Sequence, residues 1–293
     1  MTDSSPRRLR TLLGDYPGTL ALKQRKLAAP SITLDFADVK APSTAFKRVV
    51  RDLEFDVAEL ALVTYIMARA YGRPLVLLPA VLFSRSQHPY LVYNAERGRL
   101  SPRDLAGRRV GARAYSVTTV MWIRGILAND YGVDPERIHW VTFEDPHVAE
   151  YRDPPSVERA GTGKDITAML LAGELDAAIL GAVPTDPRLQ PVIPDPDAAG
   201  LEWQRRYGAL QLNHMVVVMS SLSRSDPQAV REVFRLLAES RKAAGEDPTT
   251  PFGVEPNRRN LDLALEYCQQ QKLVPRRLAL DELFDDVTRT LGA

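Results

Sequence analysis

The stretch LAGRRVGARAYSVTTVMWIRG, residues 105–125, indicates both a fold class and a binding site. Residues 108–112 have the pattern of a short buried strand, residues 113–119 form a polar turn, and the apolar spacing from Val120 onward predicts an amphipathic helix. The first turn of a helix carries unpaired N–H groups and a partial positive charge. A polar turn between a strand and a helix is therefore suited to holding an anion.

The side chains of this turn support the prediction of an anion site. Arg113 offers a fork of N–H donors that matches a carboxylate. Hydroxyl donors follow at Ser116, Thr118 and Thr119. We expect the turn to bind an anionic small molecule. A well-capped helix with ordinary surface polar residues is the alternative that this stretch alone leaves open.

Around this stretch the chain alternates strand and helix patterns. Leu75–Phe83 is a near-continuous apolar run, typical of a strand buried on both faces, and Ile32–Val39 alternates apolar and polar residues. Pro42–Asp52, with proline at a favoured helix start, and Leu60–Tyr71 have the character of helices. The alternation predicts an α/β fold with a parallel, helix-covered sheet, in which ligands bind beyond the carboxyl ends of the strands.

The order of these elements predicts two lobes. At 293 residues the chain is long for a single hydrophobic core. One α/β unit is begun, a second is inserted and the first is resumed. We therefore expect residues 1–97 and 201–293 to form lobe I and residues 98–200 to form lobe II. Two strands crossing between the lobes would act as a hinge, with a ligand cleft between the lobes.

The composition disfavours several function classes. A net charge of +1 provides no strong field for nucleic acid or a membrane surface. The one cysteine, Cys268, excludes an internal disulfide framework and a cysteine-based zinc site. No apolar run reaches transmembrane length, and the first residues lack the apolar core of a secretory signal peptide. A cytoplasmic location is therefore expected.

Common cofactor and catalytic motifs are absent from the sequence. Without a GxGxxG motif or a P-loop, nucleotide binding is disfavoured, and without GxSxG there is no sign of a serine hydrolase. The zinc motif HExxH is absent as well. We expect no cofactor. A divalent metal stays open as an alternative, because His147, Glu144 and His214 could converge in space.

Two titratable side chains at expected strand ends are candidates for catalysis. Glu59 follows the strand pattern of residues 55–58 and is the carboxylate best placed to accept a proton. His214 begins a buried strand pattern directly after Asn213. A histidine facing a cleft is a good proton donor because its pKa lies near neutrality. A structural core histidine is the alternative for His214.

Further candidates lie in a long loop and at two other strand ends. His147 lies in the loop of residues 143–163, between Glu144 and Glu150. A loop of this length in a compact protein is usually functional or disordered. Tyr16 and Arg85 follow strand patterns, so we expect both at the mouth of the cleft.

Longer segments between residues 14 and 218 carry a family resemblance. They are GDYPGTLALK (14–23), FDVAEL (55–60), PLVLLPAVLFSR (74–85), SPRDLAGRRVGARAYSVTT (101–119), YGVDPERIHWVTFED (131–145), GELDAAILG (173–181) and NHMVVV (213–218). On these segments the chain resembles the 4,5-dihydroxyphthalate decarboxylases, a family within the type II periplasmic-binding-protein-like superfamily. The motif SPRDLAGRRVG is used throughout that superfamily, whereas the loop FEDPHVAEYRDPP (143–155) is more specific.

The resemblance implies a fold and a reaction. The fold would be the two-lobed type II periplasmic-binding-protein-like fold with a ligand cleft between the lobes. The reaction would be the non-oxidative decarboxylation of 4,5-dihydroxyphthalate to 3,4-dihydroxybenzoate (protocatechuate) and CO2, a step of aromatic (phthalate) degradation. Protonation of the ring carbon that bears the departing carboxylate would break aromaticity, and loss of CO2 would restore it. Such a site needs a cation, a base, an acid and an apolar wall.

The implied site uses the candidates named above. Arg85 and Arg113, with the hydroxyls of the turn at Ser116, Thr118 and Thr119, would hold the carboxylates. Glu59 or His147 would take the phenol proton, and His214 would protonate the ring. Asn213 would orient a group, Tyr115 and Trp122 would supply aromatic walls, and Tyr16 would belong to the substrate-binding set.

The expected partner is a small aromatic dicarboxylate, with no nucleic acid and no membrane; assembly into a homo-oligomer is left open. Two alternative functions share the fold: a solute-binding protein for an aromatic carboxylate, and a related enzyme such as a decarboxylase of a different hydroxylated aromatic acid. A ligand-sensing regulator would need a DNA-binding helix-turn-helix, for which the N-terminal sequence has no room.

Overall fold

The computed structural model describes residues 5–292, which divide into two compact units. Unit 1 comprises the described residues up to Arg85 together with Leu212–Gln269 and the described residues from Val274 onward. Unit 2 comprises Ser86–Gln211 and Gln270–Leu273. The division predicted from the sequence, with lobe I at residues 1–97 and 201–293 and lobe II at residues 98–200, stays a prediction.

Unit 1 is built on a five-stranded sheet with strand order β2-β1-β3-β11-β4. The strands are β1 (Arg7–Leu12), β2 (Ile32–Phe36), β3 (Val57–Ala61), β4 (Leu75–Ser84) and β11 (Leu212–Met219). β1 is parallel to β2 and β3, whereas β11 is antiparallel to both of its neighbours, β3 and β4. The direction of β11 follows from the chain path, because Leu212 re-enters the sheet paired with Ser84, where β4 leaves it.

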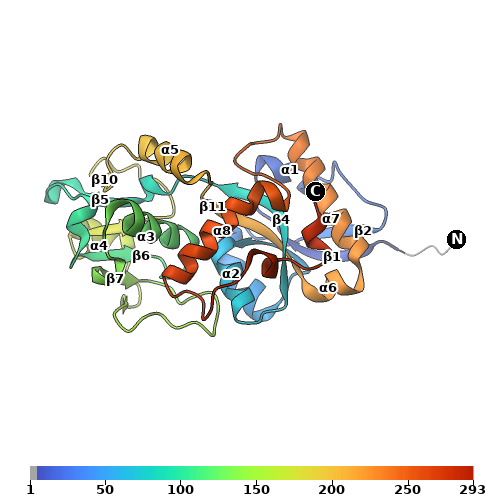
Figure 1. The fold of residues 1–293 in the computed structure, drawn as a ribbon, viewed down its shortest axis with the longest axis horizontal. Helices are drawn as coiled ribbons and strands as arrows, with labels where there is room; N and C mark the ends of the chain where they lie inside the picture. The colour runs from blue at the N-terminus through green and yellow to red at the C-terminus, as the bar shows by residue number, and fades with distance from the viewer. Residues whose placement is uncertain (1–4, 293) are drawn as a thin grey trace. The chain divides into compact units, whose positions relative to one another are not determined.

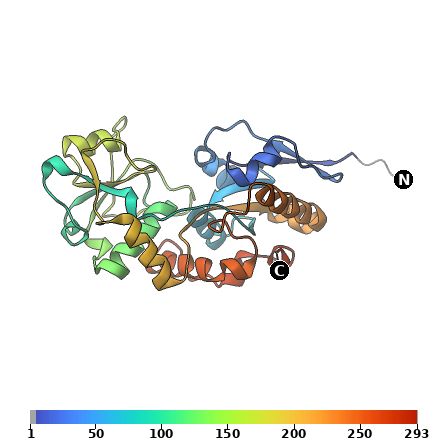
Figure 2. The same ribbon diagram turned by 90° about the horizontal axis from the view of Figure 1, so that it is seen from above.

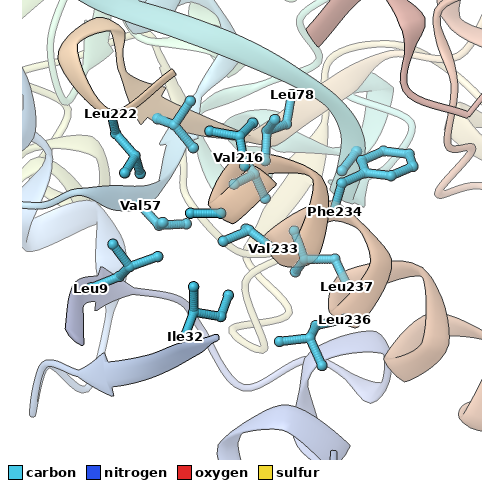
Figure 3. Close-up of a cluster of buried hydrophobic side chains, with 14 of the residues drawn as sticks. Leu9, Ile32, Val57, Leu78, Val216, Leu222, Val233, Phe234, Leu236 and Leu237 are labelled. Atoms are coloured by element: carbon cyan, nitrogen blue, oxygen red, sulfur yellow. The ribbon is translucent and has the colours of Figure 1, made fainter. Parts of the chain in front are cut away.

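The helices of unit 1 are α1 (Pro17–Lys23), α2 (Leu62–Ala70), α6 (Ser220–Ser225), α7 (Pro227–Ala243) and α8 (Val254–Gln270), whose last residue falls in unit 2. Figures 1 and 2 show α7 beside the strands of this sheet. The core forms where the apolar stripe of α7, with Val233 and Leu237, packs on strand residues such as Leu9 and Val216 (Figure 3).

Unit 2 contains a six-stranded sheet with strand order β10-β5-β9-β6-β7-β8. The strands are β5 (Leu91–Asn94), β6 (Arg109–Ala112), β7 (His139–Thr142), β8 (Glu158–Arg159), β9 (Ala177–Ile179) and β10 (Leu189–Pro191). The helices are α3 (Thr118–Tyr131), α4 (Ile166–Ala172) and α5 (Pro196–Tyr207). Strands β9, β6, β7 and β8 run parallel, and β5 is antiparallel to β9 and β10.

The segment predicted as a helix over residues 42–52 is helical in the structure, but it is not one regular α-helix. The segment instead forms a 3₁₀ turn at Pro42–Ala45 and a π-helical turn at Arg48–Asp52. Val49 and Val50 are buried and β-branched, so this segment has weak helix propensity and is held by packing. Among residues 5–292, no helix is both long and apolar enough to cross a membrane.

Candidate functional site

Tyr16, Glu59 and His214 meet in unit 1, near the carboxyl ends of its parallel strands. The hydroxyl of Tyr16 donates to Oε1 of Glu59 at 2.6 Å, and Nδ1 of His214 lies 2.6 Å from the same oxygen. The Tyr16 hydroxyl is also 3.3 Å from Nδ1 of His214. These three side chains, which we call the His–Glu–Tyr cluster, are the candidate catalytic group of unit 1.

The carboxyl group of Glu59 is completely buried, and its oxygens are satisfied from three directions. Besides the two contacts to Oε1, the backbone N–H of Gly14 donates to Oε2 at 2.7 Å. A buried carboxyl group is tolerated only when such bonds replace water. This placement suits Glu59 as the partner that orients the His214 ring.

The register of the sheet brings Glu59 and His214 together. His214 pairs with Ala61 across β11 and β3, and Val216 pairs with Glu59. Glu59 and His214 are therefore diagonal neighbours on one face of the sheet, within reach of two polar side chains. With the Nδ1 proton directed at Glu59, Nε2 of His214 is the ring nitrogen left for chemistry. No hydrogen bond to Nε2 comes from residues 5–292.

Gly14 is needed for the backbone to approach Glu59 closely. A Cβ at this position would lie 2.9 Å from Oε2 of Glu59 and 2.8 Å from the Tyr16 ring. Both distances are shorter than real Cβ contacts, so any side chain would push these groups apart. Sequence reasoning missed Gly14 as a site residue, although the motif GDYPG that begins with it marked a turn.

Aromatic rings surround the imidazole. The ring of Phe46 meets His214 edge-on with centroids 5.3 Å apart, and Phe83 does so at 5.6 Å. Phe83 also stacks with Tyr16 at 5.8 Å, and the guanidinium of Arg85 lies 5.3 Å from the Phe83 ring centroid. These rings make the surroundings of the imidazole apolar, and no sequence pattern pointed to Phe46.

The environment of Tyr16 keeps its phenol protonated. Burial is the main cause that raises the pKa of Tyr16 far above its usual value, and the negative charge and hydrogen bond of Glu59 raise it further. The nearby positive charge of Arg85 acts in the opposite direction, which also places Arg85 near the cluster. Tyr16 therefore acts as a hydrogen-bond donor at neutral pH.

The polar turn of the opening stretch lies in unit 2, at the start of α3. Ser116 and Thr118 are buried, Thr119 is half-buried, and the helix begins at Thr118. The guanidinium of Arg113 lies 3.8 Å from a carboxylate oxygen of Glu144, and both side chains are about 40% exposed. The weak pairing leaves the Arg113 guanidinium with donors for a further anion.

Two aromatic residues of this stretch lie in the interior of unit 2. Tyr115 stacks on the buried guanidinium of Arg124, 3.7 Å from the ring centroid, and meets Trp140 edge-on at 6.1 Å. Trp122 is fully buried and packs edge-on against Trp203 at 5.8 Å. Both rings thus have packing partners within unit 2.

His147 and Asn213 are both buried, and Asn213 directly precedes His214 in β11. The structure brings together the predicted residues of unit 1: Tyr16, Glu59, Arg85 and His214. The other predicted residues lie in unit 2, apart from Asn213: Arg113, Tyr115, Ser116, Thr118, Thr119, Trp122 and His147. Their roles toward a substrate stay predictions. Within the described part of the chain, no three or more His, Cys, Asp or Glu side chains gather as metal ligands.

Curated relatives resemble the chain over about two thirds of its length. A 4,5-dihydroxyphthalate decarboxylase from Comamonas testosteroni is 29% identical over 222 residues, which is 70% of this chain and 67% of the relative. A protein of the same name from Pseudomonas putida is 28% identical over 214 residues, 67% of this chain and 81% of the relative. No protein-family model matches the sequence.

Solved structures match nearly the whole chain. The alkanesulfonate-binding protein SsuA from Xanthomonas axonopodis pv. citri, bound to MOPS, matches with a TM-score of 0.61, 14% identity and coverage of 96% of this chain and 99% of SsuA. The chain has a periplasmic-binding-protein-like fold. SsuA from Escherichia coli matches with a TM-score of 0.58 and 15% identity over 96% and 98% of the two chains. The desulfurization enzyme DSZB matches with a TM-score of 0.57 and 14% identity over 96% and 97%.

Proposed function

We propose that this protein is a carboxy-lyase that removes CO2 from a hydroxylated aromatic carboxylate, with 4,5-dihydroxyphthalate as the substrate and 3,4-dihydroxybenzoate as the product. The observation that carries the proposal is the His–Glu–Tyr cluster, in a chain whose curated relatives are both named 4,5-dihydroxyphthalate decarboxylase. The reaction would belong to the catabolism of phthalate and related aromatic compounds.

The chemistry needs one proton delivered to a ring carbon. In the proposed step Nε2 of His214 donates its proton to the carbon that bears the departing carboxylate. The bond between that carbon and the carboxylate then breaks, and its electron pair returns to the ring as CO2 leaves. One proton replaces one CO2, so neither an oxidant nor a reductant is consumed. Glu59 holds the imidazole through Nδ1 and stabilises its charged form while it carries the proton.

The surroundings of the imidazole fit this step. A leaving carboxylate is disfavoured beside apolar rings, and Phe46 and Phe83 present such rings next to His214. Arg85 supplies a positive charge near the same group. In our proposal Arg85 holds a carboxylate, and Arg113 with Ser116 and Thr118 holds another. His147 takes the phenol proton, since Glu59 is already engaged with three donors.

The proposal is tested by mixing the purified protein with 4,5-dihydroxyphthalate and following the ultraviolet spectrum and CO2 release. We expect turnover in the native protein and a loss of at least about 100-fold in His214→Ala, with substrate binding retained. His139→Ala, which changes an exposed histidine on β7, is the matched control. Unchanged turnover in His214→Ala contradicts the proposed role of His214. Repeating the assay after chelation tests dependence on a divalent metal.

A solute-binding protein for an aromatic carboxylate is the second candidate. It is favoured by the similarity of the fold to that of SsuA, an alkanesulfonate-binding protein. Binding of 4,5-dihydroxyphthalate without CO2 release would support this candidate. Turnover of a different hydroxylated aromatic acid, with none of 4,5-dihydroxyphthalate, would support a related decarboxylase. A cytoplasmic location stays a prediction that cell fractionation tests.

A further inference from the structure

Unit 1 contains a pocket of about 270 Å³ beside the His–Glu–Tyr cluster. Its aromatic lining consists of Tyr16, Phe83 and Phe252, and its basic residue is Arg241 of α7. His214 is not among its lining residues, although Tyr16 and Phe83 border both the pocket and the imidazole. The volume lies slightly below that of pockets for drug-sized ligands, which limits an occupant to a small molecule.

The guanidinium of Arg241 uses only part of its N–H donors in hydrogen bonds within the described structure. Its Nη2 donates to the backbone oxygen of Asp247 at 3.1 Å, and its carbon lies 5.3 Å from the Phe252 ring centroid. The Nε atom is buried and has no hydrogen-bond partner among the described residues. An unpaired buried donor of a charged group destabilises the folded chain, so an anion that reaches this guanidinium would relieve that cost.

The acidic residue of the pocket is engaged elsewhere. Oδ1 of Asp247 accepts from the backbone N–H of Thr249 at 2.8 Å and from its hydroxyl at 2.7 Å. Asp247 therefore turns a carboxylate oxygen toward its own loop and presents its backbone oxygen to Arg241. The Asp247 carboxylate attracts the Arg241 guanidinium electrostatically, but the two side chains form no salt bridge in the described structure, so the guanidinium can still bind the negative charge of a ligand.

We propose that this pocket is a second, non-reacting site that binds a small aromatic monocarboxylate. One guanidinium matches one carboxylate, and the rings of Tyr16, Phe83 and Phe252 match one aromatic ring. If the proposed function holds, on which this point rests, the product of the reaction belongs to this class of ligand. Product would then bind beside the cluster as well as being released from it.

Tyr16 links the two sites. Its ring lines the pocket, and its hydroxyl donates to the same oxygen of Glu59 that His214 contacts. A ligand that shifts the Tyr16 ring therefore changes the hydrogen bonds that orient His214. Binding in the pocket should accordingly alter the NMR signals of the His214 ring.

Calorimetric titration of the full chain with benzoate tests the site. We expect a binding component that weakens at least tenfold in Arg241→Gln and is unchanged in Arg231→Gln, a matched change at an exposed position of α7. Benzamide, which lacks the charge, should bind equally to all three proteins. Superimposable benzoate isotherms for the three proteins would overturn the proposal.

Ala244→Phe provides a second test that leaves the charge in place. Ala244 lines the pocket from an exposed position at the end of α7, so a phenyl ring there should fill the pocket while the fold is kept. We expect loss of the Arg241-dependent benzoate component and of the benzoate-induced shift of the His214 signals. Retention of that component in Ala244→Phe would contradict the location. Because these readouts need no turnover, they succeed or fail independently of the decarboxylase assay.

Discussion

Nδ1 of His214 lies 2.6 Å from Oε1 of Glu59, across two antiparallel strands of one sheet. The carboxyl group is fully buried, whereas the imidazole is partly exposed. The Glu59 carboxyl group is thus held in the interior by protein donors, while Nε2 of His214, on the other side of the imidazole, can contact a ligand. A histidine that donates a proton benefits from such an arrangement, because the buried carboxyl partner fixes the orientation of the ring and of its proton.

Glu59→Gln tests whether the buried partner serves His214. The amide NH2 would face either the donating N–H of Gly14, which loses that hydrogen bond, or Tyr16 and His214, which would then have to accept instead of donate. We expect kcat to fall on the order of 100-fold and the free energy of unfolding to fall by about 1–3 kcal/mol. Glu266→Gln, at an exposed position of α8, is the control. Unaltered kcat in Glu59→Gln would remove Glu59 from the mechanism.

Gly14→Ala and Gly18→Ala form a matched pair. An added Cβ at Gly14 would stand 2.9 Å from Glu59, whereas at Gly18 its nearest neighbour, in Arg241, is 3.8 Å away. We expect Gly14→Ala to lower the free energy of unfolding by about 1–3 kcal/mol and to impair turnover, because it displaces Tyr16 and Glu59. Gly18→Ala should do neither. Chemical denaturation and steady-state assays measure both effects, and equal behaviour of the two variants would refute the steric argument.

The raised pKa of Tyr16 predicts how this residue contributes to stability at alkaline pH. Burial and Glu59 raise the pKa of Tyr16, so the folded protein keeps this proton above pH 10, where exposed tyrosines lose theirs. Above about pH 10 the unfolded chain releases the proton and the folded chain does not, so this contribution to stability declines as the pH rises. Ultraviolet titration of the native protein and Tyr16→Phe should give the same number of phenols ionising near pH 10. If Tyr16→Phe had one phenol fewer ionising near pH 10 than the native protein, Tyr16 would have an ordinary pKa and this prediction would be contradicted.

His88 makes unit 2 sensitive to acid. Burial lowers the pKa of His88 to about 4, and its Nδ1 lies 2.9 Å from the hydroxyl of Ser86. Between about pH 6.5 and pH 4, this histidine is protonated in the unfolded chain but not in the folded chain. The free energy of unfolding therefore falls as the pH falls, by up to about 3 kcal/mol. His88→Gln should flatten this dependence in denaturant unfolding. His139→Gln, at an exposed position, should leave it intact.

Arg113→Gln tests the carboxylate anchor predicted in unit 2. Its pairing with Glu144 is long and exposed, so the change should cost less than about 1 kcal/mol of stability. We expect the Michaelis constant for the substrate to rise at least about tenfold with little change in kcat, because the anchor would act equally in the ground and transition states. Arg103→Gln, at an exposed position of unit 2, is the control. A defect confined to kcat would oppose an anchoring role for Arg113.

Sequence patterns alone were sufficient to predict the α/β class and most of the strands. The apolar run that became β4 and the alternation that became β2 are local signals, since a strand buries side chains with a period that is visible in its own residues. The positions of the expected strand ends also predicted four candidate site residues, Tyr16, Glu59, Arg85 and His214. Ligands of such sheets bind at the carboxyl ends of the strands. The helix predicted over residues 42–52 is present as 3₁₀ and π-helical turns instead of a regular α-helix, a detail that the local pattern did not predict.

Only the tertiary structure decided which of these residues act together. Glu59 and His214 are 155 positions apart in the sequence, and no local pattern reveals that β11 returns antiparallel beside β3. The same holds for the requirement for Gly14, the ring of Phe46 beside His214, and the interior packing of Trp122 against Trp203. Periodicity and composition are properties of neighbouring residues, so the sequence by itself determined the fold class and the candidate strand ends. Contacts between distant segments depend on strand order and register, which the folded chain alone establishes.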